Sequence, residues 1–311
     1  MTIPAARYER RKMPESRDQR VYCSEQNPSE PMAGTADHVG VWVLLEYKPT
    51  WKAKALTDNS LGAPARAWLA SNLERLQAAG RRPRAQLIRQ PDVDSDEVRL
   101  LVGTPGRLLA FRGRGYGFLE HLHLPDVLAR PEAFDKETLT EPRYFVCTNG
   151  QRDACCARHG LPSYAALRER VGHRAWQVTH LGGHRFAPNV LVLPQGGLYG
   201  RVHAARVGEF VDRVESGTLF FPLLRGRSWY AGPVQAAEAL LGRSGLRLLH
   251  VEDSDRGARV TFAMAAGSRE GEAGQTIETT VTQQKEGLEV QASCGDDALK
   301  RVYPYRLDRS G

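Results

Sequence analysis

The chain has 311 residues, of which 41% are hydrophobic and 25% charged, a composition typical of a globular protein of about two domains. No apolar stretch approaches the ~20 residues of a membrane-spanning helix, and the charged N-terminus lacks the apolar core of a secretory signal, so we expect a cytoplasmic protein without a membrane anchor. The net charge is +7, but Lys and Arg are spread along the chain without a long basic run, which argues against nucleic-acid binding and fits an acidic protein partner.

The N-terminal part is expected to hold a mobile tail and a first α/β module. Residues 1–35 are polar and rich in turn formers, which predicts the tail, and Cys23 within it is interpreted as a bystander thiol. The module is expected over residues 36–138. Its pattern predicts, in chain order, a strand at 39–47, a helix at 64–79 that ends at Gly80, and strands at 85–89, 98–103 and 107–111. His121 and His123 would share one face of a strand, and we expect them to pack or lie at the surface rather than bind metal.

A second module is expected over residues 139–222. Its pattern predicts a strand at 143–147, a loop at 148–156, a helix at 162–171, a strand at 176–180, a hairpin of 189–193 with 198–202, and a closing helix at 204–214. This order, β-α-β followed by β-β-α, is the thioredoxin pattern. The first module begins in the same way, which suggests that the two modules are related.

The third segment, residues 223–311, predicts a helix at 233–241 and four strand-like runs that end near Tyr305, with a hairpin tip at 267–274. We expect an antiparallel sheet with one helix here, and Cys294 is interpreted as an isolated structural residue. The predicted fold class is therefore α/β (α+β), with the thioredoxin-like module in the middle of the chain.

The candidate functional residues are thiols and imidazoles at the ends of predicted strands, where sites usually lie. Cys147 and Cys156 are separated by eight residues, with Cys155 as an alternative to the latter, and His180 and His184 are separated by three. Such soft-to-borderline ligands in one compact unit suit a transition metal or an iron–sulfur cluster. The five cysteines are too unevenly spaced for a secreted disulfide framework, which also favours metal ligands or reactive thiols.

Four stretches of the chain resemble the sucrase/ferredoxin-like family: AGTADHV, CTNGQRDACC, HLGGHRFAPNVLVLPQGGLYGRV and RGRSWYAGPVQAAEALL. Residues 140–217 are also similar to the thioredoxin-like ferredoxins, which hold a [2Fe–2S] cluster with two cysteines in a first loop and a later Cys-x3-Cys pair. Here His180 and His184 stand at the later pair, and the family includes a fungal protein with this two-Cys, two-His ligation. The resemblance implies a [2Fe–2S] cluster on Cys147, Cys156, His180 and His184. It prefers Cys156 over Cys155 because CARHG leads directly into the helix, as in the related ferredoxins.

This ligand set predicts a Rieske-like redox centre. Two ferric ions, two sulfides, two thiolates and two neutral imidazoles sum to zero charge, so the centre accepts an electron more easily than one with four thiolates. Replacing two Cys by two His raises the potential from about −400 mV to about −150 mV or higher. The second imidazole nitrogen can carry a proton, so we expect proton-coupled electron transfer. The sequence thus favours an electron carrier or redox protein that works with a partner over a stand-alone enzyme, and it offers no pair of carboxylates for a sucrase.

Neighbouring residues and competing hypotheses complete the prediction. Gly182 and Gly183 would let backbone N–H groups approach the sulfides or would simply form a tight turn. Four basic residues near the motifs would attract an acidic partner or form a solvated face: Arg152, Arg158, Arg185 and Arg201. The alternatives are a structural Cys2His2 zinc site, whose spacing is not that of a zinc finger, and a thiol-based redox protein, which the absence of a Cys-x-x-Cys motif disfavours.

Overall fold

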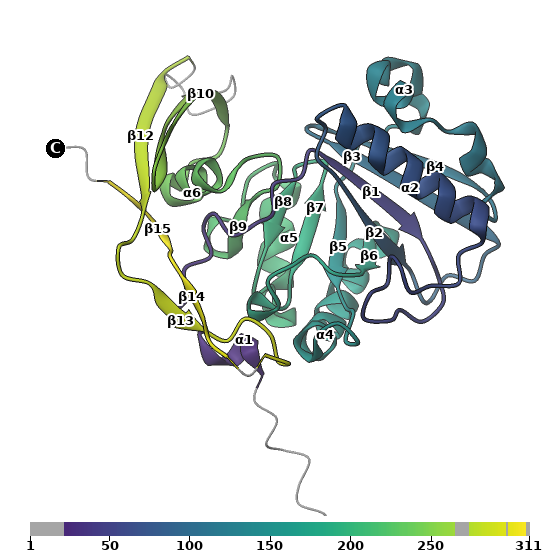
Figure 1. Cartoon of the computed structure of the whole chain (residues 1–311), viewed down its shortest axis with the longest axis horizontal. Coiled ribbons are helices and arrows are strands. Elements are labelled where there is room, and N and C mark those ends of the chain that lie inside the picture. The colour runs from purple at the N-terminus through teal and green to yellow at the C-terminus, as the bar shows by residue number, and fades with distance from the viewer. Residues whose placement is uncertain (1–21, 265–273, 297, 309–311) are drawn as a thin grey trace, which may run out of the picture.

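A nine-stranded mixed sheet runs through the computed structural model, which describes residues 22–264, 274–296 and 298–308 (Figure 1). The strand order is β4-β3-β1-β2-β6-β5-β7-β8-β9. The strands are β1 (Val41–Glu46), β2 (Pro83–Arg89), β3 (Glu97–Thr104), β4 (Arg107–Arg114), β5 (Arg143–Cys147), β6 (Ala175–Val178), β7 (Val190–Leu193), β8 (Gly197–Tyr199) and β9 (Leu224–Arg227). The predicted α/β class is confirmed, and each strand expected in the two modules is present with its ends shifted by a few residues.

The two modules share one pattern of strand pairing. β1 is parallel to β2 and antiparallel to β3, which pairs with β4. In the same way, β5 is parallel to β6 and antiparallel to β7, which pairs with β8. The modules join edge to edge through β2 and β6, with Ile88 opposite Val178. The sheet is continuous across the predicted boundary at residue 138, so the domain limits stay a prediction.

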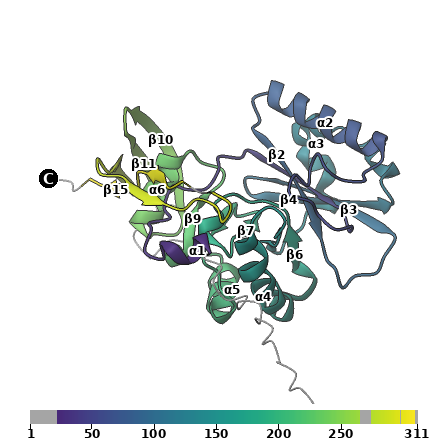
Figure 2. The same ribbon diagram turned by 60° about the horizontal axis from the view of Figure 1, so that its bottom comes forward.

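Helices cover the outer faces of the two halves. α2 (Ala63–Ala78) packs on the first half, and α4 (Ala154–Val171) and α5 (Val207–Glu215) pack on the second (Figure 2). Alternation along β1 explains the layering, because Val43 contacts the α2 side while Trp42 and Leu44 face the inner core. That inner core joins the halves, since Phe145 and Leu191 of the second module lie in the same cluster.

Two local predictions were wrong. α4 begins at Ala154, not at Pro162, because the Asp153 carboxylate accepts a hydrogen bond from Cys155 N at 2.9 Å and caps the helix; the proline lies inside the helix. His121 and His123 do not lie on a strand. A 3-10 turn (Gly117–His121) ends at the first of them, and α3 (Leu124–Ala129) starts directly after the second, with a proline in its first turn, where proline is favoured.

The C-terminal segment forms a separate antiparallel sheet against α6 (Gly232–Leu241). β10 (Leu246–Ser254), β11 (Gly257–Met264), β12 (Thr276–Gln283) and β15 (Tyr305–Leu307) form this sheet, and β13 (Leu288–Val290) pairs with β14 (Lys300–Val302). The helix and the antiparallel strands agree with the prediction, although the described residues of this segment form six strands where four were expected. Most of the expected hairpin tip, 267–273, lies outside the described residues.

The N-terminal segment lies beside the β13–β14 hairpin and α4 (Figure 1). α1 (Cys23–Gln26) is followed by an irregular stretch in which Glu30 and Met32 are buried. Residues 1–21 of the expected tail lie outside the described part of the chain. No helix within the described ranges combines the length and apolarity that crossing a membrane requires.

Candidate metal centre

The four predicted ligands lie at one edge of the second module. Cys147 is the last residue of β5, and His180 follows the end of the parallel strand β6 by two residues. Because β5 and β6 are parallel, their carboxyl ends meet at the same edge of the sheet. Cys156 lies in the first turn of α4, and His184 opens a short 3-10 turn, His184–Phe186. The chain topology therefore brings all four side chains to one place.

The side chains contact one another in pairs. The Cys156 Sγ lies 3.5 Å from the Nδ1 of His184. The rings of His180 and His184 are stacked, with centroids 4.4 Å apart and planes inclined by 25°. The Cys147 Sγ lies 2.9 Å from the carbonyl oxygen of Thr179, and Cys156 and His180 are close enough to it to lower its pKa. The two thiols and the two imidazoles thus lie together at this edge of the sheet.

Burial and mutual contact set the protonation of these groups. Burial lowers the pKa of His184, and the neighbouring His180 lowers it further, so the imidazole is neutral at neutral pH. The neutral form is the one that binds a metal. The hydrogen bond between the two thiols lowers the pKa of Cys147 and raises that of Cys156, so the proton between them favours Cys156. The Nδ1 of His180 is buried and has no hydrogen-bond partner, which leaves it available to a ligand.

A buried arginine holds the loop that carries the histidines. The Arg225 guanidinium donates to the carbonyl of Gly182 and to the Asn189 side chain, both at 2.8 Å, and to the carbonyl of Thr35 at 2.6 Å. Burial lowers the pKa of Arg225 to about 9, so it stays charged at neutral pH. Gly183 has a φ of 69°, and a Cβ there would lie 2.6 Å from this guanidinium. Glycine is therefore required here by both the turn and the arginine.

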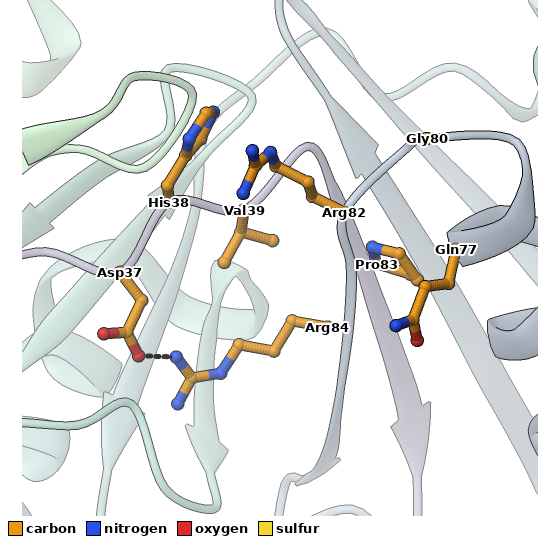
Figure 3. A pocket seen from close by; sticks show the side chains of 8 residues that line it. All are labelled: Asp37, His38, Val39, Gln77, Gly80, Arg82, Pro83 and Arg84. Atoms are coloured by element: carbon orange, nitrogen blue, oxygen red, sulfur yellow. Dashed lines mark hydrogen bonds and ion pairs between the residues drawn. The ribbon is translucent and has the colours of Figure 1, made fainter.

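A second arginine connects the N-terminal segment to the same loop. Arg84 forms an ion pair with Asp37 and donates to the carbonyl of His180 at 3.0 Å. Both side chains line a surface pocket, in which Figure 3 shows their ion pair. From β2, the Gln86 Oε1 accepts the backbone N–H of His180 at 3.0 Å. These supporting residues were not predicted, although Asp37 and Arg225 belong to the stretches AGTADHV and RGRSWY, which carried the family resemblance.

The four basic residues of the prediction divide into two groups. Arg185 forms a 2.8 Å ion pair with the buried Glu30, and Arg201 donates to the carbonyl of Asn27 at 2.9 Å, so both hold the N-terminal segment in place. Arg152 and Arg158 are exposed on α4 and the loop before it. Arg158 also forms a 3.8 Å ion pair with Glu25 and lies over the ring of Tyr22, which leaves Arg152 as the more available of the two.

Cys155, the alternative to Cys156, points elsewhere. Its Sγ lies 3.5 Å from that of Cys23 and 3.2 Å from that of Cys294. The sequence suggested an isolated Cys294 and a bystander Cys23 in a tail. Both interpretations are wrong, because the two thiols lie next to Cys155. These three cysteines and Asp153 have ligand atoms that all lie within 4.8 Å of one another. Within the described residues, the four predicted ligands do not form such a group.

Comparison with known proteins places these observations in a family context. The family model described as sucrase/ferredoxin-like matches residues 32–226, which include all four predicted ligands and Arg225. Altered inheritance of mitochondria protein 32 of Meyerozyma guilliermondii is 29% identical over 104 residues, which are 30% of this chain and 37% of that protein. The match thus spans less than half the length of the relative. No solved structure matches the chain.

Proposed function

Because this chain belongs to the sucrase/ferredoxin-like family, we propose that it is an iron–sulfur electron-transfer protein whose [2Fe–2S] cluster is held by Cys147, Cys156, His180 and His184. The observation that carries the proposal is the convergence of two buried thiols and two imidazoles, one of them 3.5 Å from a thiol, at the carboxyl edge of β5 and β6. These donors suit iron, which binds both thiolate and imidazole.

Their arrangement in pairs supports two metal ions rather than one. A tetrahedral zinc site with bonds of about 2.0–2.3 Å needs all four ligand atoms within about 4 Å of one another. The four predicted ligand atoms do not all lie within 4.8 Å of one another. In the described part of the chain, the cluster of Cys23, Asp153, Cys155 and Cys294 does. The two histidine rings stack on each other, and the two thiols are close enough to shift each other's pKa, as expected if each pair serves its own iron.

The cluster would supply reversible one-electron transfer at a potential well above that of an all-cysteine ferredoxin. The residues around it prepare the site for this role. Burial keeps the imidazole of His184 neutral, so the ligands bring only two negative charges. Arg225, Arg84 and Gln86 hold the histidine loop through its backbone, which fixes the ligand positions while the charge changes. Because Nδ1 of His184 faces Cys156, its Nε2 remains to hold the proton of a coupled transfer.

The partner would be a redox protein with an acidic surface. Arg152 and Arg158 are exposed, and Arg152 lies close enough to His184 to contribute to its lowered pKa. A positive surface next to the ligands would steer an acidic donor or acceptor to the shortest electron path. Salt should therefore slow electron exchange with such a partner.

The test is anaerobic purification of the full chain, followed by its absorption spectrum and counts of iron and acid-labile sulfide. We expect a red-brown protein with two irons and two sulfides per chain. The variants Cys147→Ser and His184→Ala should lose the visible spectrum, whereas His203→Ala, an exposed histidine outside the ligand set, should keep it. A colourless protein with zinc on these four residues, prepared with ample iron, would refute the proposal.

A further inference from the structure

The three cysteines outside the predicted site come together from three distant parts of the chain. Cys23 lies on α1, Cys155 in the first turn of α4, and Cys294 between β13 and β14. Their sulfur atoms form a triangle with sides of 3.5, 3.2 and 3.6 Å. Cys23 and Cys155 are fully buried. Packing alone would not require three thiols, separated by up to 271 residues, to meet at one point.

These distances fit ligands of one metal ion. A disulfide requires an S–S distance of about 2.05 Å, and all five cysteines are free. In a tetrahedral zinc site with Zn–S bonds of about 2.3 Å, neighbouring sulfurs lie about 3.8 Å apart. The sides of the observed triangle are shorter than that spacing by about 0.2 to 0.6 Å, a small adjustment of the side chains. An ion above the triangle needs one more ligand.

Asp153 supplies the remaining ligand. Its carboxylate and the three sulfurs offer ligand atoms that all lie within 4.8 Å of one another. One carboxylate oxygen accepts from Cys155 N at 2.9 Å, and the other accepts from Ser293 Oγ at 2.7 Å and Cys294 N at 2.9 Å. These hydrogen bonds connect the carboxylate to the start of α4 and to the segment that carries Cys294. A carboxylate oxygen can keep such bonds while it binds a cation, because it has further lone pairs.

The surroundings also favour thiolates. The hydroxyl of Ser24 lies 3.2 Å from the Cys155 Sγ, and the backbone N–H of Cys23 lies 3.4 Å from the Cys294 Sγ, so both can donate to a negative sulfur. Cys155 is in the first turn of the 18-residue helix α4, where the helix dipole stabilises negative charge. A closed, sulfur-rich site without a position for solvent is typical of structural zinc.

We propose that Cys23, Cys155, Cys294 and Asp153 form a second metal site that binds a structural Zn²⁺ ion. The ion would fasten the N-terminal segment and the β13–β14 hairpin onto the helix that carries Cys156. It would also hold Cys155 away from the adjacent redox site. This assignment is independent of the proposed iron–sulfur function, because the two sites share no ligand.

The experiment measures zinc and iron in the full chain expressed with both metals present. We expect about one tightly bound zinc per chain, with an X-ray absorption signature of three sulfurs and one oxygen. Cys294→Ser and Cys23→Ser should reduce the zinc content at least tenfold and leave the iron content unchanged. Cys147→Ser is the matched control, since it removes a buried thiol from the other site and should leave the zinc in place.

Two further measurements distinguish loss of a zinc ligand from misfolding of a variant. Reconstitution of the zinc-free wild-type chain with Co²⁺ alone should produce the thiolate-to-cobalt charge-transfer bands of a tetrahedral site, and Zn²⁺ should displace them. Cys294→His offers another zinc ligand at the same position and should retain more zinc than Cys294→Ser. A wild-type chain without zinc, with Cys23, Cys155 and Cys294 either open to alkylation or joined in a disulfide, would overturn the proposal. Zinc whose content falls with Cys147 rather than with Cys294 would also overturn it.

Discussion

The two cysteine clusters of this protein differ in how far apart their ligand residues lie along the sequence. The proposed iron–sulfur site takes four residues from one module, within residues 147–184, whereas the cluster of Cys23, Cys155 and Cys294 joins segments from both ends of the described chain. The first mixes sulfur with neutral nitrogen, which limits its charge. The second combines three sulfurs with a carboxylate. The first composition suits electron transfer, and the second suits a closed structural ion.

Cys155 and Cys156 make the comparison sharp, because adjacent residues serve different sites. Successive residues of an α-helix point about 100° apart. In the first turn of α4 this rotation directs Cys156 toward His184 and Cys155 toward Cys23 and Cys294. The pair is therefore not placed to act as one vicinal dithiol. A helix terminus thus directs two neighbouring thiols into two separate clusters of side chains.

The largest expected effect is that substitutions of two adjacent cysteines remove different metals from the protein. Cys156→Ser should abolish the visible spectrum and the iron content while the zinc content is unchanged. Cys155→Ser should do the reverse, because its thiol faces the other cluster. Metal analysis and absorption spectra of the two variants, purified in parallel, provide the measurement. If Cys155→Ser loses its colour and Cys156→Ser keeps it, the assignment of the two thiols is inverted.

The next effect concerns the nitrogen ligands that set the first site apart. His180→Cys combined with His184→Cys should retain a cluster but lower its reduction potential by roughly 250 mV, the gap between the two ligation types. The reason is that two further thiolates add two negative charges next to the accepted electron. Protein-film voltammetry measures the shift. An unchanged potential in a variant that holds two irons would contradict the charge argument.

A substitution of Arg225 tests whether the loop that carries the two histidines depends on the buried guanidinium. Arg225→Met should lower the free energy of unfolding by about 3–5 kcal/mol, because it leaves buried acceptors at Gly182, Asn189 and Thr35 without a donor. Chemical denaturation measures this change. The exposed Arg152→Met is the control and should change stability by less than about 0.5 kcal/mol. Equal stability of the two variants would show that the histidine loop holds its shape without the buried guanidinium.

The smallest effect is the pH dependence of the potential, which only the imidazole-containing site should show. A ferric ion lowers the pKa of the second ring nitrogen, and reduction raises it again because the site gains negative charge. Below the pKa of the oxidised form the potential should be flat. Above it, one proton accompanies the electron, and the potential should fall by up to ~59 mV per pH unit. Voltammetry from neutral to alkaline pH tests this slope, and the double His→Cys variant should give a flat line. A wild-type potential that is constant over the range would mean that both nitrogens keep their protons.

Local patterns in the sequence were sufficient for much of the fold and for the candidate ligands. Apolar runs of strand length predicted β1, β5 and β7, because burial on both faces leaves a signal within a few residues. Cys147 and His180 were expected in one compact unit because both lie at the ends of predicted strands. In the structure both lie at the carboxyl edge of the parallel strands β5 and β6.

Only the tertiary structure revealed the features that depend on residues far apart. The start of α4 rests on Asp153, whose carboxylate is held by Ser293 and Cys294 about 140 positions away, and no local pattern encodes that contact. Likewise, Cys23 and Cys294 show no spacing that relates them, and they meet because the N-terminal segment and the β13–β14 hairpin pack on the same helix. Sequence thus determined which residues could bind metal within one module. The long-range packing of the chain ends decided that the remaining cysteines form a second cluster, because contacts between distant segments arise only when the chain folds.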